Sequence, residues 1–365
     1  MEDMVSAQIM TVNRNFWSGK RVFLTGHTGF KGGWLALWLV DMGAEVYGYA
    51  LNPPTEPNFF TVCNLQAQLA ASTIADIRDA TSLRQAMQTT RPDMVFHLAA
   101  QPLVRYSYAA PVETYSVNVM GTINLLEAVR QTPGIKAVVN ITTDKCYENR
   151  EWIWPYRENE AMGGFDPYSS SKACSELVSA AWRRSFLEPA GVHLATARAG
   201  NVIGGGDWAA DRLIPDFLHA LDAHRTLTLR SPKAIRPWQH VLEPLAGYLK
   251  LAEALHEEGE TFAEAWNFGP EDGDSRSVQW IVAYLCSQVP GASWHCDASP
   301  QPHEANTLKL DSSKAKNRLN WQPQWNLEMA LQMTLEWHQA WKRGAELAAV
   351  TLEQIRDYNA SIQPA

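Results

Sequence analysis

Three glycines at three-residue intervals, directly after the first apolar run, constrain this chain more than any other feature. Gly26, Gly29 and Gly32 lie between the run 21–25 and the helical pattern 33–40. Glycines allow a tight turn and let backbone N–H groups and a helix N-terminus approach a pyrophosphate. They also serve ordinary turns, but a position between a strand and a helix is what dinucleotide binding requires. We therefore predict a dinucleotide-binding loop whose contacts are Gly26, Thr28, Gly29, Phe30, Lys31 and Gly32.

Short β-branched apolar runs alternate with longer helical patterns from Arg21 to roughly Arg198. This alternation is typical of repeated βαβ units and a parallel sheet. We expect strands at Arg21–Thr25, Glu45–Ala50, Gln68–Ile74, Met94–Leu98, Lys136–Thr142 and Val192–Arg198. The predicted fold class is α/β, a doubly wound parallel sheet of the Rossmann type with a smaller, mixed C-terminal lobe.

The alternation ends after Gly204-Gly205-Gly206, where prolines begin to separate shorter elements. A chain of 365 residues exceeds the length that one core usually supports. We place the Rossmann domain at 16–204 and a mainly substrate-binding lobe at 205–365, and we allow for segments of the lobe that return to the Rossmann domain. The stretch Leu327–Arg343 predicts an amphipathic helix.

Composition and charge narrow the class of protein. The net charge of −8 and the lack of a long Lys/Arg run argue against nucleic acid as a partner. Five cysteines without metal-ligand spacing predict no metal site, and their odd number favours a reducing cytoplasm. No signal-peptide pattern occupies 1–15 and no apolar run reaches membrane-spanning length. We expect a cytoplasmic protein without a membrane partner.

Two further features bear on the cofactor. Asp76 and Ile77 follow the third expected strand and could reach an adenine amine, although an Asp at such a place is as often a turn or a helix cap. The acid expected at the end of the second strand, to hold a ribose hydroxyl, is missing from 46–52. No arginine in 50–55 would accept a 2′-phosphate, so we expect NAD rather than NADP.

A second group of reactive residues follows the fifth expected strand. Thr143, Asp144 and Lys145 end that strand, and Tyr168 and Lys172 stand four apart in a helical run. This spacing places the ammonium and the phenol on one helix face, where the ammonium can stabilise a tyrosinate and reach a ribose hydroxyl. A free phenol titrates near pH ~10, so Lys172 and the nicotinamide charge are both needed to lower the pKa of Tyr168.

A Tyr-x-x-x-Lys pair alone occurs by chance, but here it joins other motifs in order. They are the glycine string, His97-Leu98-Ala99-Ala100, Asn118-Val119-Met120-Gly121-Thr122, Arg198–Gly204, Arg236–Val241 and Trp266–Gly269. With them the chain resembles the extended short-chain dehydrogenase/reductase family over nearly its whole length. The resemblance implies cofactor contacts from Leu98, Ala99, Ala100, Asn118, Tyr168 and Lys172. It implies a nucleotide sugar as substrate.

Thr143-Asp144-Lys145 resembles the Thr-Asp-Glu segment of sugar-nucleotide 4,6-dehydratases, with Lys145 where many members carry Glu. The glycine string, Asn149–Trp152 and Gly204–Trp208 resemble the branch that acts on CDP-glucose in deoxysugar synthesis for O-antigen and lipopolysaccharide. This implies oxidation at C4 by NAD, loss of water across C5–C6, and hydride return to C6.

In this scheme Tyr168 deprotonates the 4-hydroxyl, and Thr143 forms a hydrogen bond with the same hydroxyl. Asp144 is the acid at the 6-hydroxyl if burial raises its pKa. Lys145 is either the C5 base, which requires its neutral form, or a partner for a carboxylate or phosphate. The candidate substrate contacts are Gln101, Asn201, Arg212, Arg236 and His303.

Two other functions fit much of the pattern. A nucleotide-sugar 4-epimerase shares the oxidation but needs no acid such as Asp144. A redox-sensing module that binds the dinucleotide without catalysis would have no use for Tyr168 and Lys172. The apolar segments Ala109–Val129 and Tyr168–Arg184 correspond to a common dimer surface of the family, which implies a homodimer or homotetramer, although such stripes also face a core.

Overall fold

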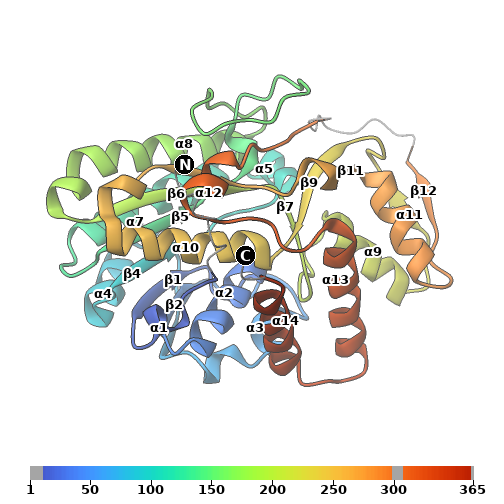
Figure 1. The fold of residues 1–365 in the computed structure, drawn as a ribbon, viewed down its shortest axis with the longest axis horizontal. Helices are drawn as coiled ribbons and strands as arrows, with labels where there is room; N and C mark the ends of the chain where they lie inside the picture. Colours follow the sequence, from blue (N-terminus) through green and yellow to red (C-terminus); the bar gives the residue numbers. More distant parts are fainter. Residues whose placement is uncertain (1–10, 298–306, 363–365) are drawn as a thin grey trace, which may run out of the picture.

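A computed structural model describes residues 11–297 and 307–362, and its centre is a seven-stranded parallel sheet (Figure 1). The strand order is β3-β2-β1-β4-β5-β6-β10. The bounds are β1 Arg21–Thr25, β2 Glu45–Ala50, β3 Ala71–Ile74, β4 Met94–His97, β5 Ala137–Ile141, β6 His193–Ala199 and β10 Ala265–Phe268. The predicted doubly wound sheet is confirmed, and its order reverses at β1 and β4, where such folds bind ligands.

Five expected strands agree with the structure to within about a residue, but the third is shorter at its start. It begins at Ala71 instead of Gln68. The amide of Gln68 donates hydrogen bonds to the carbonyls of Cys63 and Asn64, and the backbone before it forms a 3-10 turn at Leu65–Ala67. Local side-chain bonding to the backbone therefore delays the strand.

Helices cover both faces of the sheet. On one face α2 (Phe30–Asp41) and α10 (Leu242–Glu258) share a core with the strands, and α14 (Leu347–Ser361) packs on α2. On the other face α4 (Ala80–Thr90) and α7 (Gly121–Arg130) form a second core, and α8 (Pro167–Trp182) contacts α7. Burial on both faces explains why the strands are almost wholly apolar.

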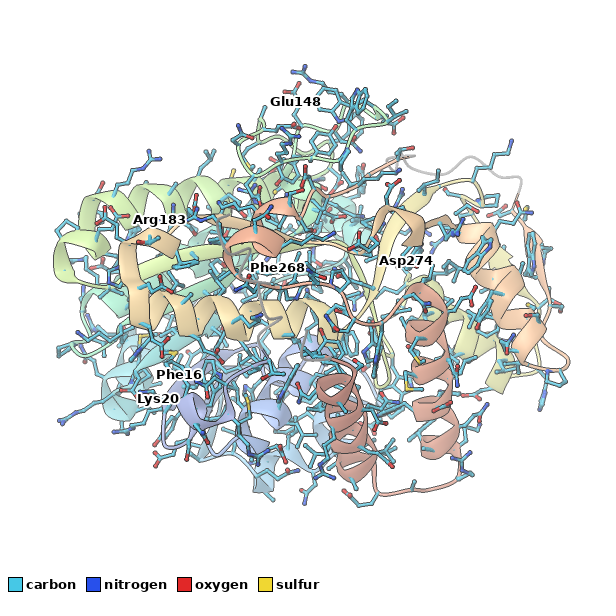
Figure 2. All side chains as sticks on the ribbon, in the orientation of Figure 1. Phe16, Lys20, Glu148, Arg183, Phe268 and Asp274 are labelled. Atoms are coloured by element: carbon cyan, nitrogen blue, oxygen red, sulfur yellow. The ribbon has the colours of Figure 1, made fainter. Side chains whose placement is uncertain are left out.

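Shorter helices complete this part of the chain. They are α1 Arg14–Trp17, α3 Phe59–Val62, α5 Val104–Ala109, α6 Pro111–Tyr115 and α12 Ser313–Arg318, with a π-helical turn at Ser116–Met120. A loop between β5 and α8 carries Glu148 and projects beyond the rest of the molecule (Figure 2). Ile153, Trp154 and Phe165 are exposed on it.

The second region has its own small sheets and core. One sheet has the order β11-β9-β7, antiparallel on one side of β9 and parallel on the other, and β12 pairs with β8. The bounds are β7 Asn201–Ile203, β8 Leu227–Leu229, β9 Ile235–His240, β11 Ser275–Ser277, β12 Trp294–Cys296, α9 Leu213–Asp222, α11 Val278–Gln288 and α13 Leu327–Lys342. The mixed lobe is confirmed. Helix α13 begins where the amphipathic helix was predicted to begin and ends one residue before its predicted end.

The chain passes between the two regions more than once. After β9 the chain forms α10 on the main sheet, and β10 then pairs with β6 as the last strand of that sheet. The carboxyl ends of the central strands therefore face the lobe that β7, β8, β9 and α9 build. Within residues 11–297 and 307–362, no helix is long and apolar enough to cross a membrane.

Candidate active site

A cavity of about 710 Å³ lies at the carboxyl ends of the main strands and extends into the smaller lobe. On the sheet side its walls come from the glycine loop, the ends of β2, β3 and β4, the segment after β5, and the first turns of α8. On the lobe side they come from β7, the start of α9, the β8 strand and the start of β9. A cavity of this kind is where an open α/β sheet binds its ligands.

The glycine loop brings backbone close to backbone. Gly26 has a φ of +79°, and a Cβ there would lie 2.8 Å from the carbonyl carbon of Leu98 and the nitrogen of Ala99. Within the described structure no side chain caps the N-terminus of α2, at Gly29, and Gly29, Phe30 and Lys31 line the cavity. Uncapped N–H groups at a helix N-terminus fit the pyrophosphate of a dinucleotide.

The predicted adenine end lies beside this loop. Asp76 and Ile77 both line the cavity, as do the residues that end β2. The carboxylate of Asp76 accepts hydrogen bonds from Nε and Nη2 of Arg78, at 3.0 and 2.5 Å, and these bonds lower the pKa of Asp76. Asp76 is therefore ionised at neutral pH and is held at the cavity edge by its neighbour.

Helix α8 positions the predicted tyrosine and lysine. Asp166 caps its N-terminus by accepting a hydrogen bond from the Ser169 backbone at 2.9 Å. Tyr168 and Lys172 are buried one turn apart and both line the cavity, as their spacing predicts. Lys172 Nζ donates to the carbonyl of Ile141 at 3.1 Å, and burial lowers the pKa of Lys172 to about 8, which the charge of Glu176 partly opposes.

In the protein without its cofactor, the pKa of Tyr168 is raised. Burial raises the pKa of Tyr168 to about 12, while a hydrogen bond with Thr143 lowers it and the charge of Asp144 raises it. The ammonium of Lys172 is directed at the Ile141 carbonyl, which explains why the helix pair alone does not produce a tyrosinate. The cavity needs a further positive charge beside Tyr168 for that.

Asp144 is a buried acid that lines the cavity. Burial raises the pKa of Asp144 against the opposing charges of Lys145, Arg236 and Lys31. Its Oδ1 accepts a hydrogen bond from Thr143 Oγ1 at 3.0 Å, whereas its Oδ2 is buried without a partner among the described residues. A side chain at Gly200 would come within 3.2 Å of Oδ2.

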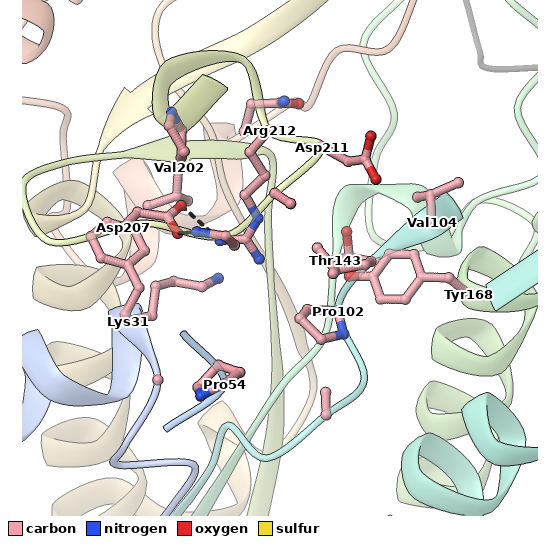
Figure 3. A pocket seen from close by; sticks show the side chains of 18 of the residues that line it. Lys31, Pro54, Pro102, Val104, Thr143, Tyr168, Val202, Asp207, Asp211 and Arg212 are labelled. Carbon is pink, nitrogen blue, oxygen red and sulfur yellow. Dashed lines mark hydrogen bonds and ion pairs between the residues drawn. The ribbon is translucent and has the colours of Figure 1, made fainter. Parts of the chain in front are cut away.

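Two lysines face the cavity from different elements. Lys145 lies half-buried in the 3-10 turn Asp144–Cys146 and is close enough to lower the pKa of Asp144. Burial, together with the charges of Lys172 and Arg212, lowers the pKa of Lys31 to about 7. Figure 3 shows Lys31 with Arg212 on one side of the cavity and Thr143 with Tyr168 on the other.

Three predicted substrate residues reach the cavity. Asn201 lines it from β7, Arg236 lines it from β9 and is buried, and Arg212 lines it at the start of α9. Arg212 Nη1 pairs with Asp207 Oδ2 at 2.8 Å (Figure 3). Two arginines and an asparagine on one wall provide the paired donors that a diphosphate accepts.

Two other predicted contacts lie behind the cavity wall. The amide of Gln101 bonds to Leu103 and Thr114, and Asn118 bonds to the Gln101 backbone and to Ser171. Neither residue lines the cavity in the described structure, because both side chains are engaged in holding the loop after β4. The structure therefore does not place Gln101 against a substrate or Asn118 against a cofactor. The predicted His303 lies outside the described residues.

A set of charged side chains at the substrate end of the cavity, contributed by α5 and the lobe, was not predicted from the sequence. They are Arg105, Asp207, Asp211, Asp216 and Arg230, and all of them line the cavity. Arg105 Nη1 and Arg230 Nη1 contact Asp211 Oδ1 at 3.3 and 2.6 Å. These partners stand up to 106 positions apart in the chain, so no local pattern signals them. Only Asp207 falls in a segment, Gly204–Trp208, that the sequence analysis had singled out.

Comparison with known proteins agrees with this arrangement. The family model for GDP-mannose 4,6 dehydratase matches residues 23–334. The CDP-glucose 4,6-dehydratase of Salmonella typhimurium is 56% identical over 353 residues, which cover 95% of this chain and 98% of the relative.

Solved structures of similar fold include two nucleotide-sugar enzymes. The UDP-glucose 4-epimerase of Thermotoga maritima superposes with a TM-score of 0.76 at 22% identity, covering 88% of this chain and 99% of that one. The dTDP-glucose 4,6-dehydratase of Bacillus anthracis, solved with NAD, gives 0.73 at 19% identity, covering 90% and 100%. These likenesses support the fold. On the family match and the 56% identity, this chain belongs to the GDP-mannose 4,6 dehydratase family of nucleotide-sugar enzymes.

Proposed function

We propose that this protein dehydrates CDP-D-glucose to CDP-4-dehydro-6-deoxy-D-glucose, as a hydro-lyase that holds NAD tightly. The observation that carries the proposal is the 56% identity, over 95% of the chain, to a CDP-glucose 4,6-dehydratase. The cavity supports the proposal, because the glycine loop, Tyr168 with Lys172, and the buried Asp144 all line one continuous space.

NAD fits the sheet side of the cavity. The uncapped N-terminus of α2 and the close approach at Gly26 suit its pyrophosphate, and Asp76 and Ile77 suit the adenine. Leu98, Ala99 and Ala100 line the middle, and Lys172 would hold the nicotinamide ribose. When bound, NAD takes up a hydride from C4 of the sugar and later returns it to C6.

In the first step Tyr168 removes the proton of the 4-hydroxyl. Its pKa of about 12 is too high for this in the protein alone, and Lys172 donates to the Ile141 carbonyl, so the positive charge of a bound nicotinamide ring would be needed to lower it. Thr143 contacts the same phenol and is placed to hold the 4-hydroxyl against it.

In the second step Asp144 gives a proton to the departing 6-hydroxyl. The buried Oδ2 of Asp144, unpartnered among the described residues, leaves room for a proton, and burial raises the pKa of Asp144, which favours the protonated form that this step requires. The 4-keto group acidifies the proton at C5, which Lys145 is placed to remove from the neighbouring turn. Water leaves with the 6-oxygen, and the overall redox state of the sugar is unchanged.

The setting of the enzyme is part of the proposal. We place it in the cytoplasm, in deoxysugar synthesis for O-antigen and lipopolysaccharide, with a Rossmann domain at 16–204 and a mainly substrate-binding lobe at 205–365. Val112 and Leu177 are 82% and 60% exposed on the helices expected to pair, which supports a homodimer or homotetramer. Light scattering that shows a monomer at micromolar concentration would contradict the oligomer.

Product mass tests the function directly. The purified protein with catalytic NAD should remove one water from CDP-glucose and little or none from the UDP, dTDP and GDP sugars. Unchanged mass with every sugar would remove the dehydratase assignment. Asp144→Asn separates dehydration from 4-epimerisation, because only the dehydratase needs an acid at the 6-hydroxyl. We expect this variant to oxidise C4, seen as NADH absorbance, but to release no water.

A further inference from the structure

The far end of the cavity, in the smaller lobe, carries a carboxylate and a guanidinium side by side. Asp216 lies in the first turn of α9 and Arg230 follows β8, and both line the cavity. In Figure 1 helix α9 lies on the side of the molecule opposite to β1 and β2, which bind the dinucleotide in the proposed function. With the sugar at Tyr168 and the diphosphate near Arg212 and Arg236, this end is left for the base.

Asp216 and Arg230 are close but form no direct hydrogen bond with each other, so a donor and an acceptor stay available for a ligand. Arg230 Nη1 is fixed by Asp211 Oδ1 at 2.6 Å. Its other nitrogen, Nη2, stands 3.7 Å from Asp216 Oδ2, which is an ion-pair distance but too long for a hydrogen bond. Asp211 therefore fixes one guanidinium nitrogen, Nη1. The other nitrogen, Nη2, and the Asp216 oxygen are left as a hydrogen-bond donor and an acceptor side by side.

Apolar side chains line the same part of the cavity as this pair. Leu227, Leu229 and Ala234 are buried residues of the same wall, and Val278 lines the cavity at the start of α11. Such a wall suits the faces of a planar ring, and a ring bound there would cover the Asp216 and Arg230 side chains, which are 34% and 30% exposed without it. Hydrogen bonds to the edge then discriminate strongly, because a wrong partner leaves buried polar groups unpaired.

Cytosine and uracil differ at the two atoms that such a pair would meet. Cytosine presents an amine donor at C4 beside an acceptor at N3, whereas uracil presents an acceptor at C4 beside a donor at N3. An aspartate accepts from the cytosine amine, and an arginine donates to ring acceptors. With uracil both contacts would become repulsive.

We propose that Asp216 and Arg230 select the base of the substrate, with Asp216 accepting from the C4 amine of cytosine and Arg230 Nη2 donating to N3. Asp211 is a positioning residue that holds the guanidinium in register. The inference rests on the proposed function for the expectation of a cytidine nucleotide, but it concerns binding of the base and not the chemistry at the sugar.

Nucleotide binding without turnover tests the assignment. Calorimetry with CDP and UDP on the NAD-loaded protein should show the wild type favouring CDP by tenfold or more. In Asp216→Asn, whose amide can donate to the C4 oxygen of uracil, that preference should fall at least tenfold. Arg230→Lys, which keeps a charge for Asp211 but lacks the second arm, should weaken CDP more than UDP.

Asp222→Asn is the matched control. It makes the same change on the same helix, but Asp222 pairs with His338 and Lys342 outside the described cavity wall. It should keep the wild-type preference. Circular dichroism melting would show that each variant is folded.

Three results would overturn the inference. One is equal affinity of the wild type for CDP and UDP, and another is a preference in Asp216→Asn within twofold of wild type. The third is an equal increase in the affinities for CDP and UDP in Asp216→Asn. It would show that the Asp216 carboxylate acts by repelling the phosphates, which are common to both nucleotides. A wild type that prefers CDP through Asp216 but dehydrates no CDP-glucose would refute the proposed function alone.

Discussion

The two ends of the cavity are made from different materials. The cofactor end consists mainly of glycine backbone, a helix N-terminus and apolar strand ends, with an ion pair, Asp76 with Arg78, at its edge. The ion pair of Glu176 on α8 with Arg198 on β6 does not line the described cavity and is sealed in the core. The substrate end carries ion pairs in its wall, and the side chain of Asp211 is 41% exposed. A backbone cradle is fixed by the fold, whereas paired charges can exchange partners with a ligand.

The difference predicts how each end responds to change. Removing a buried charge or adding a methyl group at the cofactor end should cost stability or cofactor affinity. Neutralising a charge at the substrate end should leave the fold intact and alter which ligand binds. The catalytic residues lie between the two ends, and there the largest effects on rate are expected.

Tyr168→Phe should have the largest effect. The change removes the phenolic oxygen that takes the 4-hydroxyl proton, so turnover should fall about 10²–10⁴-fold. NAD binding should persist, because the phenyl ring still fills its place. Steady-state product formation and NAD titration measure the two. Tyr284→Phe, outside the described cavity wall on α11, should turn over like the wild type, and more than a tenth of wild-type activity in Tyr168→Phe would contradict the proposed base.

Glu176→Gln should have the next largest effect, on stability. The Glu176 and Arg198 side chains are 5% and 4% exposed, and removing one partner of a buried pair costs about 3–5 kcal/mol. Arg198 lowers the pKa of Glu176 despite its burial, so this stabilisation is present above its ordinary value of 4.5 and is lost as the pH falls through the lowered pKa. Urea unfolding at neutral pH measures the loss.

Asp211→Asn is the corresponding change at the substrate end of the cavity, to be compared with Glu176→Gln in the core. Its two ion pairs are partly exposed to solvent, so their loss should change the free energy of unfolding by less than about 1 kcal/mol. Asn also tolerates the φ of +62° at this position. If both variants lost similar stability, the contrast between a sealed pair and a ligand-facing pair would be wrong.

Gly26→Ala should weaken NAD binding about tenfold or more. Its Cβ would meet the backbone of Leu98 and Ala99 at 2.8 Å, in a left-handed conformation that costs about 1–2 kcal/mol for a residue with a side chain. Gly19→Ala isolates the conformational part, because Gly19 has a φ of +75° and no atom within 4 Å of the added carbon. Fluorescence titration with NADH measures both. Equal losses of affinity would show that close approach at Gly26 does not matter.

Sequence alone predicted the fold because its determinants are local. Strand and helix periods repeat along 21–199, and glycine spacing requires a particular turn, so five strands were placed to about a residue and the glycine loop was placed between β1 and α2. The strand β10 was not placed, since its four residues lie after the lobe and pair with β6 far earlier in the chain. Long-range pairing has no local pattern.

The site divides in the same way. Residues that belong to motifs, such as Tyr168 and Asp144, lie where predicted. From the sequence, the amides of Gln101 and Asn118 could bond to substrate, to cofactor or to their own loop. In the structure both form hydrogen bonds within the loop after β4, and neither lines the described cavity. The ion pairs of the substrate end, such as Arg230 with Asp211, depend on tertiary contacts and could not be inferred from spacing.

A further small effect that we predict is a loss of base preference in mild acid. Burial, with the charge of Asp211, raises the pKa of Asp216 to about 6, while His219 lowers it and Asp207 raises it, and Arg230 faces it at 3.7 Å. The ionised carboxylate accepts most strongly from the cytosine amine, and protonation gives Asp216 an O–H that can donate to the C4 oxygen of uracil. The ratio of UDP to CDP dissociation constants should therefore be constant above about pH 7 and fall severalfold as the pH drops through 6.

Taking the ratio removes the titration of the terminal phosphate, which is common to both nucleotides. Asp216→Asn should show a flat ratio over the same range, since its amide does not titrate. A wild-type ratio that stays constant from pH 7.5 to about 5 would mean that the ionisation of Asp216 does not contribute to base selection. A fall in the ratio that persists in Asp216→Asn would assign the titration to another group.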